Sequence, residues 1–172
     1  MKRALPLMLL LACGSPTLDD SDLCDACARE CTVDMPAITS AAHVTDPVDY
    51  SDPPPAGGDH DGCWAPFGVH EDPLAPENWV HNLEHGAVVY LHDCLPGCAD
   101  DLAAIEAMTA TLTEGTWLIT PYEGLTTRFA AISWGVRMQT DCGSTDLMRD
   151  FYETHVANAP EEVLSGPPEA CM

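Results

Sequence analysis

The sequence predicts a small α+β fold in which a sheet of three or more strands packs against two main helices and an ordered proline-rich loop. Two observations lead to this class. Apolar β-branched runs and amphipathic stretches follow one another in the order strand, helix, strand, strand, helix, which is typical of mixed layers and not of a helical bundle. The chain has 172 residues, enough for one such domain and not comfortably for two.

The regular elements are expected from residue 76 onward. Residues 76–85 form a short helix, because proline fits its first turn and Gly86 follows its end. Apolar side chains spaced by three and four residues predict amphipathic helices at 99–112 and 146–157. Runs rich in β-branched or other apolar residues predict strands at 87–92, 117–122 and 128–138.

Residues 43–76 are rich in turn signals. The stretch PPPAGGDH at residues 53–60 cannot form a regular helix or a central strand. Trp64 and Phe67 follow it, and such large rings need a place in a core. We therefore expect this segment to be an ordered loop that packs onto the domain.

The N-terminus resembles a bacterial lipoprotein signal. Lys2 and Arg3 precede an apolar run at residues 4–12 that is too short to cross a bilayer, and a small alanine stands before Cys13 as at a cleavage site. We expect residues 1–12 to be a signal peptide and Cys13 to carry the lipid. The alternative is a plain secretory signal that happens to contain a cysteine.

Behind the lipid we expect an acidic, cysteine-containing tether at residues 13–42 and a single α+β domain at residues 43–172. The aspartate-rich composition of the tether can bury little apolar surface. The lipid on Cys13 is the expected contact with a membrane. The protein is then expected in the cell envelope, anchored on the periplasmic side or at the outer membrane.

The charge of the chain excludes one class of partner. Six basic and 28 acidic residues give a formal net charge of −22. Such a surface repels nucleic acid and anionic lipid headgroups, so we expect no nucleic-acid partner. Solubility is a simpler explanation for the acidic composition than recognition of a dedicated cationic partner.

The cysteines indicate an oxidising compartment. There are nine, and lipidation of Cys13 leaves an even set, which in an exported chain suggests disulfides. Cys94 and Cys98 flank a turn and are placed to close a local loop. The CxxCxxxC cluster has a spacing that also suits a metal, but an exported chain favours disulfides there; its cysteines are Cys24, Cys27 and Cys31.

The stretch VHNLEHG at residues 80–86 carries the strongest chemical signal. His81 and His85 are one helical turn apart, so their rings share a face, and Glu84 lies beside it. The letters match the HxxEH zinc-peptidase arrangement, but Gly86 and a β-branched run end the helix at once. The remaining interpretations are a metal site of another kind and histidines that only form hydrogen bonds.

The sequence also resembles a bacterial family known as domain of unknown function 3105. The resemblance covers residues 43–161 and is most specific at VHNLEHG. It departs from the family pattern at Pro55, Ala56 and Asp59, which are loop positions. The other matching pieces, in chain order, are His43-Val44, Tyr50, residues 53–60, Trp64, residues 120–125, residues 131–135 and residues 159–161.

This resemblance implies no activity, but it implies which polar residues belong to the shared pattern: His43, His60, His81, Glu84 and His85. It leaves out His70, His92 and His155. Imidazoles from two loops and one helix, with a carboxylate, suit zinc or copper better than calcium or magnesium. We expect these five residues to be the metal ligands, with Glu84 as a ligand or as a partner of the ligands.

The leading functional hypothesis is therefore a cell-envelope lipoprotein domain that binds a transition metal, zinc or copper, through clustered histidines. One alternative is a metal-dependent hydrolase with Glu84 as the general base. Another is a non-catalytic envelope interaction domain whose histidines only form hydrogen bonds. Whether the protein is an enzyme is left open by the sequence.

Overall fold

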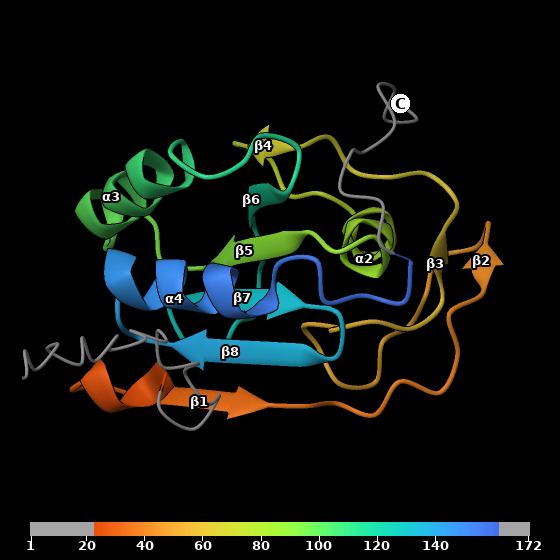
Figure 1. Cartoon of the computed structure of the whole chain (residues 1–172), viewed down its shortest axis with the longest axis horizontal. Helices are drawn as coiled ribbons and strands as arrows, with labels where there is room; N and C mark the ends of the chain where they lie inside the picture. The colour runs from red at the N-terminus through yellow and green to blue at the C-terminus, as the bar shows by residue number, and fades with distance from the viewer. Residues whose placement is uncertain (1–22, 162–172) are drawn as a thin grey trace, which may run out of the picture.

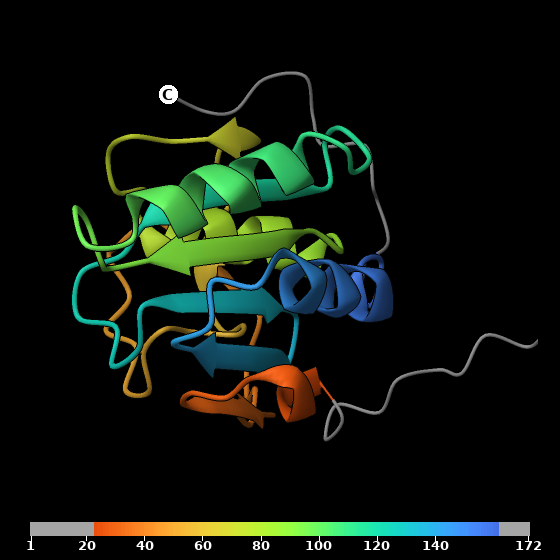
Figure 2. The same ribbon diagram turned by 90° about the vertical axis from the view of Figure 1, so that its left-hand side faces the viewer.

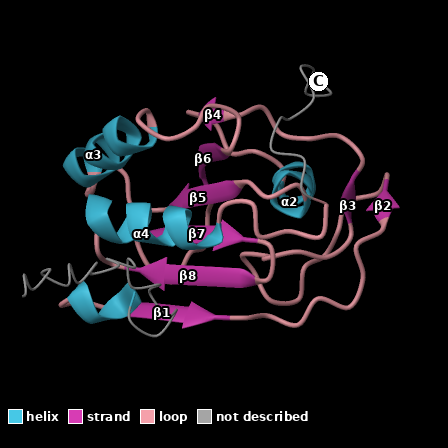
Figure 3. Cartoon of the chain, in the orientation of Figure 1, coloured by secondary structure: helices cyan, strands magenta, loops and turns pink. Residues whose placement is uncertain are grey.

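A six-stranded mixed sheet forms the centre of the computed structural model, which describes residues 23–161 (Figures 1 and 3). The parallel pair β5 (Val88–His92) and β6 (Trp117–Pro121) lies beside the antiparallel hairpin β7 (Phe129–Ser133) and β8 (Val136–Thr140). Two short strands form the edges, β1 (Cys31–Asp34) next to β8 and β4 (Gly68–Val69) next to β6. With three α-helices around this sheet, the predicted α+β class is confirmed.

The sheet is covered on both faces, as Figure 2 shows with α3 and α4 in front of it. On this face α3 (Ala99–Thr109) and α4 (Thr145–His155) pack against Val88 and Tyr90. On the other face α2 (Pro76–Glu84) packs against Val89 and Leu91. Because successive residues of a strand point to opposite faces, β5 is buried along its whole length.

The strand predicted at residues 128–138 is in fact two strands. Trp134 and Gly135 form a tight turn between β7 and β8, and Gly135 has a φ of 78°, in the left-handed region that favours glycine. Apolar residues continue through the turn, so the sequence pattern did not indicate a break between two strands. The resulting hairpin widens the sheet and brings β8 beside β1.

The stretch predicted to be a tether, residues 13–42, contains a short strand in its second half. Residues 31–34 form β1, which pairs antiparallel with β8 from Cys31 opposite Thr140 to Asp34 opposite Arg137. The folded unit therefore begins before residue 43. The short, polar strand has little hydrophobic pattern, so only the pairing with β8 defines it.

The predicted signal peptide and the lipid site at Cys13 lie outside the described residues. Within residues 23–161, none of the helices is both long and apolar enough to cross a membrane.

The proline-rich segment is ordered by pairing and by an ion-pair anchor. Two-residue strands β2 (His43–Val44) and β3 (His60–Asp61) pair in parallel and lie beside α2. Arg137, buried on β8, binds the Asp34 carboxylate through two nitrogens at 3.0 and 2.7 Å. The same guanidinium donates to the carbonyls of Asp52 and Pro54 at 2.9 Å, which holds the loop to the sheet.

The cysteines form disulfides, as the exported character of the sequence predicted. The cluster near the N-terminus is bonded as Cys24–Cys31 and Cys27–Cys142, and the local loop is closed by Cys94–Cys98. Cys63 is disulfide-bonded as well. The alternative of a metal in the CxxCxxxC cluster is therefore wrong. The Cys27–Cys142 bond joins the first described residues to the end of β8.

Arg137→Met is expected to destabilise the protein by about 3 kcal/mol, because it removes several charge-assisted hydrogen bonds and leaves buried carbonyls unpaired. Arg128→Met, immediately before the neighbouring strand β7, is the matched control. Arg128 and its partner Asp101 are 24 and 41 % exposed, so the loss there is less than about 1 kcal/mol. Denaturant unfolding of both variants measures the difference, and equal losses would contradict the anchor role of Arg137.

Replacement of Cys27 and Cys142 by serine is expected to cost more stability than replacement of Cys94 and Cys98. The two bonds span sequence separations of 115 and 4 residues. The loop-closure relation gives about 5 kcal/mol for the longer loop and about 2 kcal/mol for the shorter one. Thermal and denaturant unfolding of the two double variants test the order, and the reverse order would count against it.

Candidate metal centre

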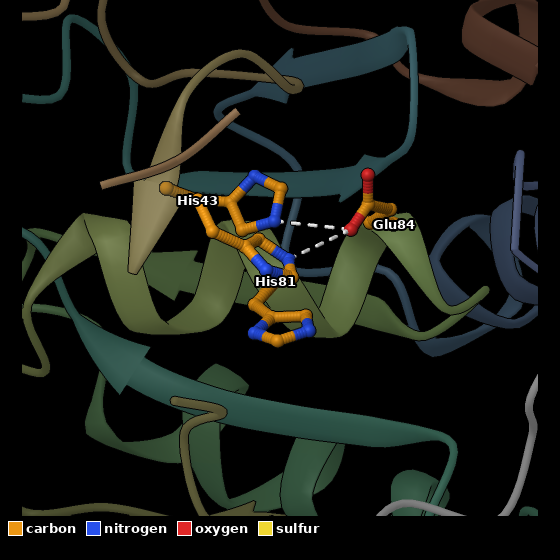
Figure 4. A group of neighbouring side chains, drawn as sticks. His43, His81 and Glu84 are labelled. Atoms are coloured by element: carbon orange, nitrogen blue, oxygen red, sulfur yellow. Dashed lines mark ion pairs between the residues drawn. The ribbon is translucent and has the colours of Figure 1, made fainter. Parts of the chain in front are cut away.

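Four polar side chains from three separate elements meet in one place (Figure 4). His43 lies on β2, His60 on β3, and His81 and Glu84 on α2. Each offers one ligand atom, and these atoms all lie within 4.8 Å of one another. The ring centroids of His43, His60 and His81 are 4.8 to 4.9 Å apart in each pair. This His/Glu group could hold a metal ion.

Helix α2 supplies two of these groups because of where it begins and ends. Pro76 occupies the first turn, and Gly86, with a φ of 93°, follows the C-cap His85. The last helical turn is buried although it is polar. Its Asn82 forms hydrogen bonds with both the N–H and the C=O of Ala65, at 2.9 and 3.0 Å, so the helix also holds the loop in front of it.

The proline-rich loop supplies the other two groups. His43 and His60 are direct partners in the β2–β3 register. A Cβ atom at Gly57 would overlap the side chain of Ile38, and the φ of 148° at this residue is one that L side chains rarely adopt. The carbonyl of the next residue, Gly58, accepts a hydrogen bond of 2.8 Å from Nδ1 of His60. The two glycines thus set the orientation of the His60 ring.

The contact between His60 and Glu84 is chemically unusual. Because Nδ1 of His60 donates to a carbonyl, the neutral ring presents a lone pair at Nε2. That atom lies 3.0 Å from Oε2 of Glu84, and neither atom has a hydrogen-bond partner among the described residues. The two residues are 0 and 5 % exposed. Two buried acceptors at this distance repel each other unless a cation or a proton lies between them.

His81 is also oriented by the backbone. Its Nδ1 donates to the carbonyl of Asp61 at 2.9 Å, and its Nε2 faces Nε2 of His85 at 3.0 Å. Burial, and next the proximity of the other imidazoles, lowers the pKa of His81 to about 4. The ring is therefore neutral at neutral pH, the form that binds metals. A neutral His81 accepts from His85, which leaves Nδ1 of His85 as a buried acceptor without a partner in residues 23–161.

Two tryptophans enclose the imidazoles. Trp64 stacks on His85 with ring centroids 4.2 Å apart and an interplanar angle of 16°. Trp134 meets His60 edge to face at 6.2 Å. The open side of the site is formed by His43, whose side chain is 55 % exposed. Three of the four groups are thus held in a dry environment, and the fourth faces the solvent.

His85 belongs to a neighbouring group rather than to the group of four. It lies with Glu84 and Glu161, again with all ligand atoms within 4.8 Å. Nε2 of His85 is 3.9 Å from Oε2 of Glu161. The backbone N–H of Glu161 donates to the carbonyl of Glu84 at 3.1 Å, which holds the segment after α4 against the end of α2.

The structure therefore brings His43, His60, His81 and Glu84 together and places His85 beside them. Among the described residues, neither group that could hold a metal includes a further histidine. The three histidines that the resemblance left out lie elsewhere: His92 on β5, His155 on α4, and His70 with its Nε2 near the carbonyl of Pro66.

Glu161 and Trp64 were not expected at the site. Both lie in pieces of the resemblance, which was the one available signal, but neither has a local pattern that points to a ligand or to a ring stacked on a histidine.

The family of the chain is shown by a family model described as "Protein of unknown function (DUF3105)", which matches residues 43–166. The chain belongs to this family, and the resemblance drawn from its histidine and proline motifs is confirmed. No curated protein and no solved structure matches the chain. Family membership names no activity, so the functional argument depends on the geometry of the site.

In the metal-free protein, Glu84→Gln is expected to raise stability by about 1 kcal/mol, because the new amide can donate to Nε2 of His60 and the repulsion between two acceptors disappears. Glu77→Gln is the control on the same helix. Glu77 accepts from the N–H of Val48 at 2.8 Å, and glutamine keeps an acceptor for it. That change should stay within about 0.5 kcal/mol. Thermal unfolding in the presence of a chelator measures both, and a loss of stability in Glu84→Gln would contradict the repulsion.

Proposed function

We propose that this domain binds one zinc or copper ion through His43, His60, His81 and Glu84. The observation that supports this most directly is the pair of buried acceptors, Nε2 of His60 and Oε2 of Glu84, 3.0 Å apart with no hydrogen bond. Two buried acceptors at this distance cost stability, and a positive charge between them, whether a metal ion or a proton, turns the cost into a gain. Proteins tend to keep such destabilising arrangements at functional sites.

The donor set favours a transition metal. Three imidazole nitrogens and one carboxylate oxygen suit zinc or copper, whereas calcium and magnesium prefer sites made of oxygen. The spacing of the donors agrees with a small ion. Ligand bonds of about 2 Å around one ion place neighbouring donor atoms roughly 3 to 3.5 Å apart. The observed distances from Oε2 of Glu84 to His60 and His43 are 3.0 and 3.6 Å.

Binding is favoured over hydrolysis because of the place of Glu84. A general base must lie beside the metal-bound water and not on the metal. The carboxylate of Glu84 contacts two of the proposed histidine ligands, within the group of four. Four protein ligands complete a tetrahedral zinc site, which is typical of structural, storage or delivery roles. The exposed ring of His43 gives the ion a route in and out.

We place this function in the cell envelope. The lipoprotein-like N-terminus with Cys13 supports a lipid anchor, and the disulfides support an oxidising compartment. Such a protein would hold its metal outside the cytoplasm, close to a membrane surface. A strongly acidic chain of net charge −22 also raises the local concentration of cations.

Metal analysis of the full chain, purified in detergent and never exposed to a nickel column, tests the proposal. We expect at least one equivalent of zinc or copper in the wild-type protein. His60→Ala and His81→Ala should each lower the affinity at least tenfold, since removing partners of ligands already costs 10- to 100-fold.

The matched control is His92→Ala, which removes a buried histidine from β5 outside the metal group. It should keep the wild-type affinity. Less than a tenth of an equivalent in the wild type, unchanged after zinc or copper is added, would overturn the proposal. Retention of affinity in both His60→Ala and His81→Ala would do the same.

A further inference from the structure

His85 carries a ring nitrogen that the protein leaves unsatisfied. Its Nε2 donates to His81, so its Nδ1 is an acceptor, and this atom is buried without a partner among residues 23–161. The side chain is only 10 % exposed, so water does not easily replace the missing partner. Moving the ring proton to Nδ1 exchanges an unpaired acceptor for an unpaired donor. Either form leaves a buried nitrogen unpaired at a cost of about 1 to 3 kcal/mol, so the protein fully satisfies neither tautomer of His85.

Two carboxylates stand near this ring. Glu84 approaches it from the end of α2, and Glu161 lies 3.9 Å from its Nε2. Glu161 is held there through its backbone, because its N–H donates to the carbonyl of Glu84. The contact between Ala157 N–H and the carbonyl of Gly86, at 2.9 Å, fixes the preceding turn to the same helix end. These backbone bonds fix the main chain of Glu161 beside the end of α2.

We propose that His85, Glu84 and Glu161 bind a second divalent transition-metal ion, with Glu84 bridging the two ions. This inference rests on the proposed function, because Glu84 is shared with the group of His43, His60 and His81. Nδ1 of His81 donates to Asp61, so His81 would bind the first ion through Nε2. That releases Nε2 of His85, beside Glu161, as the ligand nitrogen for the second ion. A carboxylate has two oxygens with several lone pairs and can serve two metals at once. In two-metal sites the ions lie about 3.5 to 4 Å apart, a distance that one carboxylate spans.

The two ions differ in their expected affinity. The first is surrounded by four protein ligands in a mostly buried site, whereas the second has three and lies next to Glu161, whose side chain is 62 % exposed. Three protein ligands leave a coordination position for water, which is the arrangement of open metal sites. The second ion also enters beside the charge of the first. Loading therefore takes place in two steps, with the exposed site filled last.

Calorimetric titration of the metal-free full chain in detergent with Zn²⁺, and in parallel with Co²⁺ followed by visible absorption, tests the proposal. We expect two equivalents in the wild type, bound in two steps. Glu161→Gln should bind one equivalent with the affinity of the first step unchanged. Because this residue is exposed, the substitution leaves the fold intact, which circular dichroism checks. Glu153→Gln, an exposed change on α4, is the matched control and should bind two.

Each outcome decides a different point. One equivalent in the wild type, with no effect of Glu161→Gln, overturns the second site and leaves the proposed function standing. Two equivalents in both the wild type and Glu161→Gln also overturn it. No binding in the wild type overturns the proposed function together with this inference. His85→Gln gives a second measurement at the buried ligand and should reduce the stoichiometry from two to one.

Discussion

The fold around the site is governed by the burial of one carboxylate. Glu84 is 5 % exposed, and the side chains that contact its carboxylate are imidazoles and not lysine or arginine. The free-energy cost of burying an isolated carboxylate far exceeds the gain from one hydrogen bond. The groups that contact the carboxylate must therefore be held in place. The surrounding structure does this with backbone groups: carbonyls orient the rings of His60 and His81. The β2–β3 pair presents His43 and His60 to the helix.

This requirement explains the irregular half of the molecule. The face of the sheet that α2 covers is closed by a loop with only two-residue strands, which have little stability of their own. The loop is tied to the sheet by Arg137 at one end and to α2 by Asn82 at the other. Between these anchors His60 is held with its Nε2 3.0 Å from Oε2 of Glu84. The rigid part of the fold thus supports a site built largely from loop residues.

The sequence predicted the regular elements well because their signals are local. Pro76 and Gly86 delimited α2, and the apolar periodicity found α3 and α4. It missed the turn at Trp134-Gly135, which lacks the usual polar turn residues, and it missed β1, which is defined only by its partner strand. His43 and His60 have no local signal at all, since their meeting depends on pairing across 17 residues. Only the resemblance to a family connected them to VHNLEHG.

The proposed metal site would couple metal binding to the order of the loop. His43 and His60 belong to the loop, whereas His81 and Glu84 belong to the helix, so an ion between them adds a link between the two. Binding to the folded form alone stabilises it by RT ln(1 + [M]/Kd), about 2.7 kcal/mol at a hundredfold excess over Kd. The four groups lie on β2, β3 and α2, so the proposed ion would link the loop to the helix and not to the six-stranded sheet. Bound at this group, an ion would add its stabilisation to the contact between the proline-rich loop and α2.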